Sequence, residues 1–170
     1  MKKTMWLLWG AAGLVILIDQ AVKYFVSAAL EPGAVWSPLP GPNPLIQIIH
    51  AANTGFAFGL FKDLGIVPIL VPLIISGVIV LYARRLHAGQ KFMALALGLT
   101  LGGALGNVID RLRIGYVIDY FDIGIGALRN ASNFADWSIV LGIILLSMAM
   151  LLEERKLQKE KAAGSSDSKA

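Results

Sequence analysis

Long segments without charged residues are the feature of this 170-residue chain that most restricts its fold. Residues 4–18, 64–83, 92–109 and 137–152 contain no Asp, Glu, Lys or Arg. A helix that crosses the roughly 30 Å hydrocarbon core of a bilayer needs about 20 apolar residues, and these segments approach that length. Charged residues make up only 15% of the chain, against roughly 25% in soluble domains. An ordinary soluble domain is therefore excluded.

We predict an all-α integral membrane protein with a single domain over residues 1–152. Its four transmembrane helices are expected near residues 5–27, 64–82, 92–111 and 134–152. Ten of the 15 Lys and Arg residues precede the first span, separate the second from the third, or follow the fourth. Basic residues mark the cytoplasmic side, so both termini are expected inside, and the segments 28–63 and 112–133 outside.

The segments outside these spans carry further predictions. Leu45–Phe61 is apolar with β-branched residues and is expected to form short strands. Arg113–Ser132 is more polar and is expected to be a loop. The charged, then Gly/Ser-rich tail 153–170 is expected to be a frayed helix end and disordered. Lys2 and Lys3 before an apolar run also suit a cleaved signal peptide. The polar residues near position 20 interrupt that run, so we expect the first segment to remain as a span.

Ionisable residues inside spans are costly and usually mark function. In the first span, Asp19 and Lys23 are four residues apart and can pair on one helix face beside Gln20. They form either a structural ion pair or a contact to substrate. Lys23 and Ser27 have the same spacing, which also allows a Ser–Lys nucleophile.

Other polar positions allow both a structural and a functional interpretation. Asn53 and Gly55 suit a simple turn, or a backbone edge that holds a peptide. In the third predicted span, glycines recur every four residues and favour close helix packing. That run ends in Asn107, Asp110 and Arg111, whose side chains share the outer end of the span.

Two carboxylates are predicted to meet near the outer surface. Asp119 follows the third span and Asp136 opens the fourth, which enters the membrane from the same side. Two carboxylates that share a site do not both ionise easily, and one acid with one base is what water attack on an amide requires. The alternative is that Asp136 only caps its helix and Asp119 belongs to a polar loop. Asp110 with Asp136 is a second possible pair.

A metal centre is not expected. His50 and His87 lie on opposite sides of the predicted membrane, there is no Cys, and no His-Glu-x-x-His motif occurs. The basic residues are expected to set topology rather than to bind nucleic acid.

Five blocks of the sequence, in order, resemble the lipoprotein signal peptidase family, also called signal peptidase II. They are Asp19-Gln20-x-x-Lys23, Asn53-Thr54-Gly55-x-x-Phe58, Gly102-Gly103-x-x-Gly106-Asn107-x-x-Asp110-Arg111, Val117-x-Asp119-Tyr120 and Asn133-x-Ala135-Asp136. Each block alone is weak, but five in order on four spans form a specific pattern.

The resemblance implies an aspartic endopeptidase of the bacterial inner membrane that uses no metal or cofactor. Such an enzyme removes signal peptides from diacylglyceryl-modified prolipoproteins, cleaving just before the lipidated cysteine. Asp119 and Asp136 would be its catalytic pair. The supporting or substrate-binding residues would be Asp19, Gln20, Lys23, Asn53, Gly55, Asn107, Asp110, Arg111, Asn133 and Ala135.

The resemblance also implies a small β-structure and a surface helix on the outer side. It further implies contact with membrane lipids, inhibition by globomycin and action as a monomer. Two features depart from the family pattern: Trp137 follows Asp136 where a small polar residue is expected, and Asp122 is an additional nearby acid.

Two other function classes compete with the peptidase. A small transporter or proton-coupled carrier would use the polar residues as a pathway, and a membrane scaffold would need only the glycine stripe. The crowding of polar groups at the outer end of the spans favours the peptidase.

Overall fold

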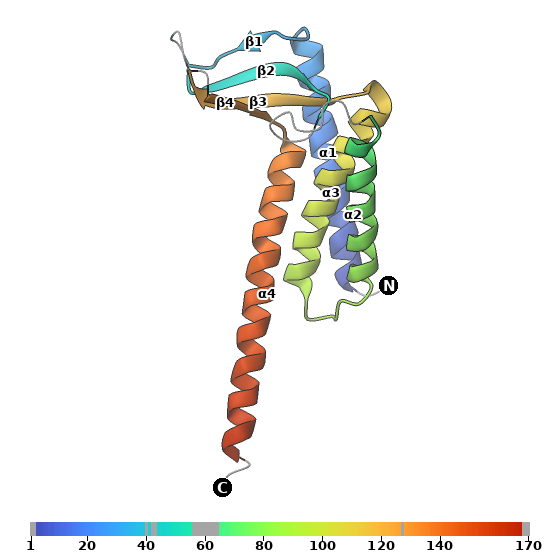
Figure 1. The fold of residues 1–170 in the computed structure, drawn as a ribbon, viewed down its shortest axis with the longest axis vertical. Coiled ribbons are helices and arrows are strands. Elements are labelled where there is room, and N and C mark those ends of the chain that lie inside the picture. Colours follow the sequence, from blue (N-terminus) through green and yellow to red (C-terminus); the bar gives the residue numbers. More distant parts are fainter. Residues whose placement is uncertain (1–2, 40, 42–43, 56–64, 127, 168–170) are drawn as a thin grey trace.

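The computed structural model describes residues 3–39, 41, 44–55, 65–126 and 128–167. Within these residues the chain forms four helices and one four-stranded antiparallel sheet. The helices are α1 (Lys3–Ala29), α2 (Val67–Ala83), α3 (Lys91–Ile114) and α4 (Phe134–Asp167), and the strands are β1 (Val35–Trp36), β2 (Ile46–Asn53), β3 (Val117–Ile125) and β4 (Leu128–Ser132). The sheet lies across one end of the helices, the N-terminus lies near the other end, and α4 extends well beyond its neighbours (Figure 1).

Among the described helices, three are long and apolar enough to cross a membrane: α1, α3 and the first 23 residues of α4. The helix α2 is apolar but has only 17 residues. The predicted class of helical membrane protein is therefore confirmed. Large apolar side chains such as Leu17, Ile74 and Leu151 are exposed on the outer faces of the helices, as expected for residues that contact lipid.

The central helix α3 packs closely against α1 and α4 because glycines line its contacts. A Cβ atom on Gly98 or Gly102 would overlap the backbone of α1, and a Cβ on Gly103 would overlap Ala135 of α4. Small residues at such positions let helix backbones approach. The packing role predicted for the glycine stripe is thus confirmed, and it brings the polar residues at one end of α1, α3 and α4 together.

The sheet corrects one prediction and confirms another. The strand β2 lies within the predicted Leu45–Phe61 strand region, of which residues 56–61 lie outside the described part of the chain. The prediction of a loop over Arg113–Ser132 is wrong, because β3 and β4 form a hairpin there. The run Val117–Ile125 is rich in β-branched and aromatic residues, which favour strands. Its two acids, Asp119 and Asp122, lie on opposite faces of the strand.

The tail also differs from its prediction of disorder, because α4 continues as a helix to Asp167. The residues just after the predicted span are strong helix formers such as Glu, Arg, Lys and Leu. One i,i+4 hydrogen bond, from the Gln158 side chain to Glu154, adds local support at 3.2 Å.

Candidate active site

A buried lysine organises the polar residues where α1 meets α3. The Lys23 Nζ atom lies 2.8 Å from Asp19 Oδ2 and 2.7 Å from Asp110 Oδ2. It also donates a hydrogen bond to Asn107 Oδ1 at 3.0 Å, and only 2% of its side chain is exposed. Gln20 donates to Asp110 Oδ1 at 2.8 Å. A buried cation of this kind requires paired carboxylates, and both acids are committed to it.

Asn107 connects this cluster to α4. Its Oδ1 atom accepts the bond from Lys23, which leaves its Nδ2 group as a donor, and that group donates to Asp136 Oδ1 at 2.7 Å. Lys23 therefore fixes the orientation of the Asn107 amide, and the amide in turn fixes one oxygen of Asp136.

The first turn of α4 is held by four side chains, so the position of Asp136 is tightly defined. Asn133 and Asp136 form a reciprocal cap: the Asp136 N–H donates to Asn133 Oδ1 at 3.0 Å, and the Asn133 N–H donates to Asp136 Oδ2 at 3.3 Å. The Ala135 N–H donates to Asp19 Oδ1 and the Phe134 N–H to the Tyr120 hydroxyl, each at 3.0 Å. The N–H groups that a helix leaves unpaired are thus satisfied.

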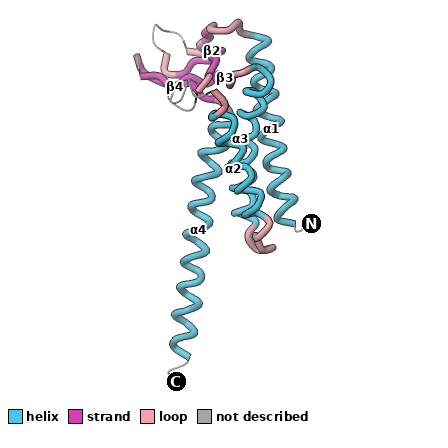
Figure 2. Tube along the Cα trace, turned by 45° about the vertical axis from the view of Figure 1, so that its right-hand side comes forward, coloured by secondary structure: helices cyan, strands magenta, loops and turns pink. Residues whose placement is uncertain are grey.

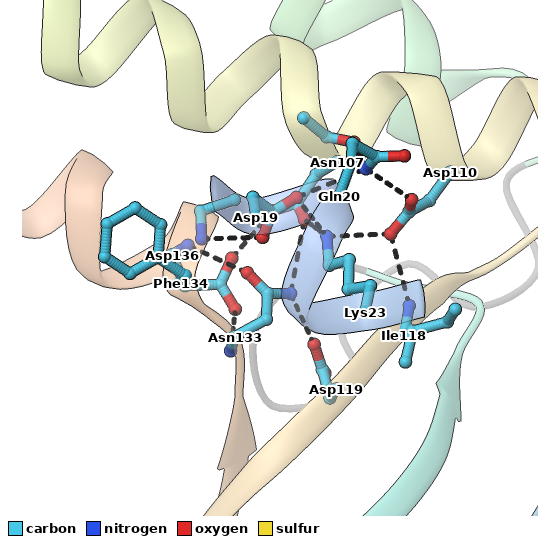
Figure 3. Close-up of polar contacts among 12 residues, drawn as sticks. Asp19, Gln20, Lys23, Asn107, Asp110, Ile118, Asp119, Asn133, Phe134 and Asp136 are labelled. Atoms are coloured by element: carbon cyan, nitrogen blue, oxygen red, sulfur yellow. Dashed lines mark hydrogen bonds and ion pairs between the residues drawn. The ribbon is translucent and has the colours of Figure 1, made fainter. Parts of the chain in front are cut away.

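Asp119 lies on β3 and is held by two amides. Asn133 Nδ2 donates to its Oδ1 at 2.7 Å, and Asn53 Nδ2 donates to its Oδ2 at 2.9 Å. Asn133 therefore contacts both carboxylates of the predicted pair, through its side-chain amide to Asp119 and through its backbone to Asp136 (Figure 3). The strand pairing of β2 with β3 positions Asn53 for this contact.

Burial, with a smaller contribution from the nearby charge of Asp136, raises the pKa of Asp119 to about 6. The hydrogen bonds from Asn53 and Asn133 oppose this shift because they stabilise the ionised form. Burial also raises the pKa of Tyr120 to about 12, so its hydroxyl remains protonated.

A cavity of about 540 Å³ opens beside this cluster. At its polar end lie Asn53, Gly55, Asn107, Arg111 and Asp136. The rest of its lining is mostly apolar and comes largely from α2, α3 and α4, including Pro72, Ala104, Ile139 and Ile143, while β3 and β4 add Val117 and residues 130–132. Arg111 reaches across the polar end to the carbonyl oxygen of Gly55. The site therefore combines acids with an apolar pocket, as substrate sites commonly do.

Trp137 is one of the cavity-lining residues and also joins α4 to the sheet. Its Nε1 group donates to Ser132 Oγ at 3.1 Å, and its ring meets the Phe121 ring edge-to-face at 6.4 Å between centroids. Ser132 Oγ in turn donates to the carbonyl oxygen of Phe121 at 3.2 Å. This departure from the expected small residue thus ties the strand of Asp119 to the helix of Asp136.

The structure brings the sequence-predicted residues into one connected cluster. Its members are Asp19, Gln20, Lys23, Asn53, Gly55, Asn107, Asp110, Arg111, Asp119, Asn133, Ala135 and Asp136. Phe58 of the second sequence block lies outside the described residues.

Several alternatives are disfavoured by the contacts. Ser27 donates its hydroxyl to the backbone oxygen of Lys23, and the Lys23 amine has three other partners, so the pair is not arranged as a nucleophile and base. Asp122 lies on the other face of β3 from Asp119 and pairs with Arg129 at 2.6 Å. Among the described residues, no group of His, Asp or Glu side chains could hold a metal ion.

Two contributors were not found from the sequence. The Tyr120 hydroxyl holds the first turn of α4, although its only sequence signal is its place beside Asp119. The apolar wall from α2 carries no polar residue, so nothing in the sequence marks it as part of a site.

The comparisons with known proteins point in one direction. A family model described as signal peptidase (SPase) II matches residues 11–152. A lipoprotein signal peptidase from Moorella thermoacetica is 37% identical over 139 residues, covering 82% of this chain and 89% of the relative. One from Syntrophus aciditrophicus is 36% identical over 164 residues, covering 92% and 99%.

A solved structure gives the same picture. The structure of a bacterial membrane enzyme determined by the in meso method at 2.3 Å resolution aligns with a TM-score of 0.75 and 30% identity. The alignment covers 85% of this chain and 87% of that one.

Proposed function

Because the chain belongs to the signal peptidase II family, we propose that it works as an aspartic endopeptidase with Asp119 and Asp136 as its catalytic pair. Removal of signal peptides from prolipoproteins is the function that this membership gives the chain. The finer proposal is that the substrate carries a diacylglyceryl group and is cleaved just before the modified cysteine.

The observation that carries the proposal is the contact of one residue, Asn133, with the carboxylates of both acids. Asn133 bonds Asp119 through its amide and Asp136 through its backbone N–H. Asn107 and Asn53 each hold one further carboxylate oxygen. Both carboxylates are thus held by neutral N–H donors rather than by a cation. They lie next to a cavity large enough for a substrate segment.

In the proposed reaction, one Asp removes a proton from water as the water attacks the scissile carbonyl. The other Asp, still protonated, donates a hydrogen bond or a proton to the carbonyl oxygen. Asn107 and Asn133 orient the two carboxylates, since their amides are already bonded to them. A pKa of about 6 for Asp119 supports a pair that keeps one proton up to about pH 6.

The alternative pair of Asp110 and Asp136 has less support. Both Asp110 oxygens are occupied, one by Lys23 at 2.7 Å and the other by Gln20 at 2.8 Å. Asp110 also accepts a bond from the Ile118 N–H at 3.4 Å. We assign Asp110, with Asp19 and Lys23, to positioning the outer ends of α1, α3 and α4.

The cavity supports an apolar, lipid-bearing substrate. Its apolar wall includes Val71, Ile75, Ile139, Val140 and Ile143, whereas Asn107, Arg111 and Asp136 are among its polar lining residues. Asp119 does not line the cavity itself but lies next to it, bonded to the lining residue Asn53. We propose that the acyl chains or the apolar part of the signal peptide occupy the wall and that the scissile bond lies at the polar end. Globomycin-type inhibitors would compete for the same cavity.

We place the protein in the bacterial inner membrane as a monomer, with α2 as a fourth span. A 17-residue helix is about 26 Å long, slightly less than the roughly 30 Å hydrocarbon core, and α2 packs against α3 and runs alongside it in the bundle (Figure 2). Basic residues gather at the end of the bundle away from the sheet, which supports cytoplasmic termini and an active site at the periplasmic face. A transporter would need polar groups at mid-membrane depth, whereas the polar groups of this chain gather at the outer end of the spans.

The test is cleavage by the purified full-length protein in detergent. The substrates are a diacylglyceryl-modified prolipoprotein and the same prolipoprotein without the lipid, and a parallel reaction contains EDTA. We expect cleavage of the lipidated substrate only, at the bond before the cysteine by mass spectrometry, with no effect of EDTA. Equal cleavage of both substrates would refute the lipid requirement, and inhibition by EDTA would refute a metal-independent mechanism.

A further inference from the structure

The sheet has one apolar and one polar face, and the strand register assigns residues to each. Residues directly opposite each other on neighbouring strands lie on the same face. Phe121 faces Ile48 and Ser132, and Ile123 faces Ile46 and Asn130. Ile125 faces Leu128, and Trp36 faces Ile48. One face of the sheet, which we call the apolar face, thus carries the large apolar residues Trp36, Ile46, Ile48, Phe121, Ile123, Ile125 and Leu128, with Asn130 and Ser132 on β4 as polar members.

The opposite face carries Gln47, Asp122 and Arg129, together with the apolar residues Val35 and Ile49 near β1. Asp122 faces Gln47, and Arg129 faces Gly124 on the neighbouring strand. Arg129 pairs with Asp122 at 2.6 Å and also donates to the carbonyl oxygen of Pro44 at 2.9 Å. The two faces therefore suit two different environments, one apolar and one aqueous.

The apolar face is turned toward the membrane-spanning helices. Phe121, which belongs to it, meets the ring of Trp137 in the first turn of α4, and Ser132 of the same face bonds the Trp137 indole. The sheet projects sideways from that point, across the direction of α4 (Figure 1). The apolar face is therefore continuous, through Trp137, with the exposed apolar residues Val140, Leu141 and Ile144 of α4.

The end of this face lies beyond any protein cover in the described structure. Leu128 is 86% exposed and Ile125 is 75% exposed, and they form a cross-strand pair at the end of the β3–β4 hairpin. Adjacent exposed apolar residues on a soluble surface are unfavourable, since each costs about 1.5–3 kcal/mol relative to burial. Since the apolar face continues into the lipid-facing surface of α4, lipid is the material that would cover them.

We propose that the β3–β4 hairpin is a membrane anchor: Ile125 and Leu128 insert into the outer leaflet of the bilayer, and the Asp122–Arg129 pair faces water. Asp119 lies on the same face of β3 as Ile125, six residues earlier in the strand. The anchor therefore holds the strand that carries Asp119 at a fixed depth beside the membrane-spanning helix that carries Asp136.

This inference requires only that the helices span the membrane, so its test needs no peptidase activity. The chain has no Cys, so Leu128→Cys and Ile125→Cys each create a single site for a nitroxide label. Both side chains are largely exposed, and the substitutions leave the protein core untouched. Gln47→Cys on the polar face is the matched control. The labelled full-length proteins are reconstituted into phosphatidylcholine/phosphatidylglycerol vesicles, and collisions with oxygen and with a water-soluble nickel chelate are measured by electron paramagnetic resonance.

We expect nickel collisions at positions 125 and 128 to be about tenfold less frequent than at position 47, the ratio that an exclusion cost of about 1.4 kcal/mol produces. Oxygen collisions should show the opposite order, because oxygen concentrates in lipid. Equal nickel accessibility at all three positions would overturn the proposal. Protection from both reagents that disappears as the protein is diluted in lipid would also overturn it, and would indicate a second copy of the chain instead.

Discussion

The two amide donors to Asp119 lower its pKa and so oppose the larger effect of burial. Asn53 Nδ2 donates to Asp119 Oδ2 at 2.9 Å, and this bond lowers the pKa of Asp119 against the larger effect of burial. In Asn53→Ala that donor is lost, while the bond from Asn133 remains. The ionised form of Asp119 becomes less stable, so the pKa must rise further above its present value of about 6.

The size of the change follows from the strength of the bond. A hydrogen bond to a charged group is worth about 1.5–3 kcal/mol, and each pH unit corresponds to about 1.36 kcal/mol. The pKa of Asp119 should therefore move from about 6 to between about 7 and 8. If activity requires one proton in the pair, the activity of the wild type falls as pH rises above about 6, and in Asn53→Ala the fall occurs at the higher pH.

The assay is kcat/KM for cleavage of a diacylglyceryl-modified prolipoprotein in detergent, measured from pH 5 to 9. Gln47→Ala is the control, because Gln47 is an amide of the same strand on the face away from Asp119. We expect its profile to match that of the wild type. An Asn53→Ala profile that is lower at every pH but unmoved along the pH axis would refute the reasoning, since it would give Asn53 a purely structural role.

Three further predictions concern the supports of the site. Lys23→Met leaves Asp19 and Asp110 buried without their cation and should destabilise the protein by about 3–5 kcal/mol; an unchanged midpoint in detergent unfolding would contradict this. Gly102→Ala places a Cβ atom 2.7 Å from the Ala12 carbonyl oxygen of α1 and should cost about 1–3 kcal/mol, whereas Gly77→Ala in α2, with nothing within 4 Å, should cost nothing in the same unfolding assay. Trp137→Phe removes the hydrogen bond to Ser132 and should lower the free energy of unfolding by about 0.5–1.5 kcal/mol. Trp137→Ala should lower it more, because the ring contact with Phe121 also disappears. Equal losses in the two variants would show that the ring contact contributes nothing.

The sequence is most informative inside the membrane spans, where a charged residue is energetically costly and needs a partner or a function. In the first span, the spacing of Asp19 and Lys23 predicts an ion pair, and the Lys23 Nζ atom lies 2.8 Å from Asp19 Oδ2. The second contact of the same amine, 2.7 Å from Asp110 Oδ2, joins two helices and has no signal in the local spacing. The helices were predictable for the same reason, because charge-free segments of nearly the right length have few other folds available.

The strands were harder to predict because their side chains point alternately to an apolar and to a more polar face of the sheet. In β3 the apolar residues Phe121, Ile123 and Ile125 alternate with Asp122 and Gly124, and the polar members suggest a loop when the pairing partner β4 is unknown. The role of Tyr120 was equally hidden, since a hydroxyl that caps a helix 14 residues later leaves no local pattern. Such contacts depend on the register of the sheet, which short-range spacing does not define.

The central claim, that Asp119 and Asp136 act as one catalytic pair, is tested most directly by four single substitutions in the cleavage assay. The variants are Asp119→Asn, Asp136→Asn, Asp110→Asn and, as the matched control on the other face of β3, Asp122→Asn. All four are compared with the wild type at equal amounts of folded protein. We expect no detectable cleavage by the first two, reduced cleavage and stability in Asp110→Asn, and near-normal cleavage by Asp122→Asn. Cleavage that survives Asp119→Asn but is abolished in Asp110→Asn would contradict the account and move the pair to Asp110 and Asp136.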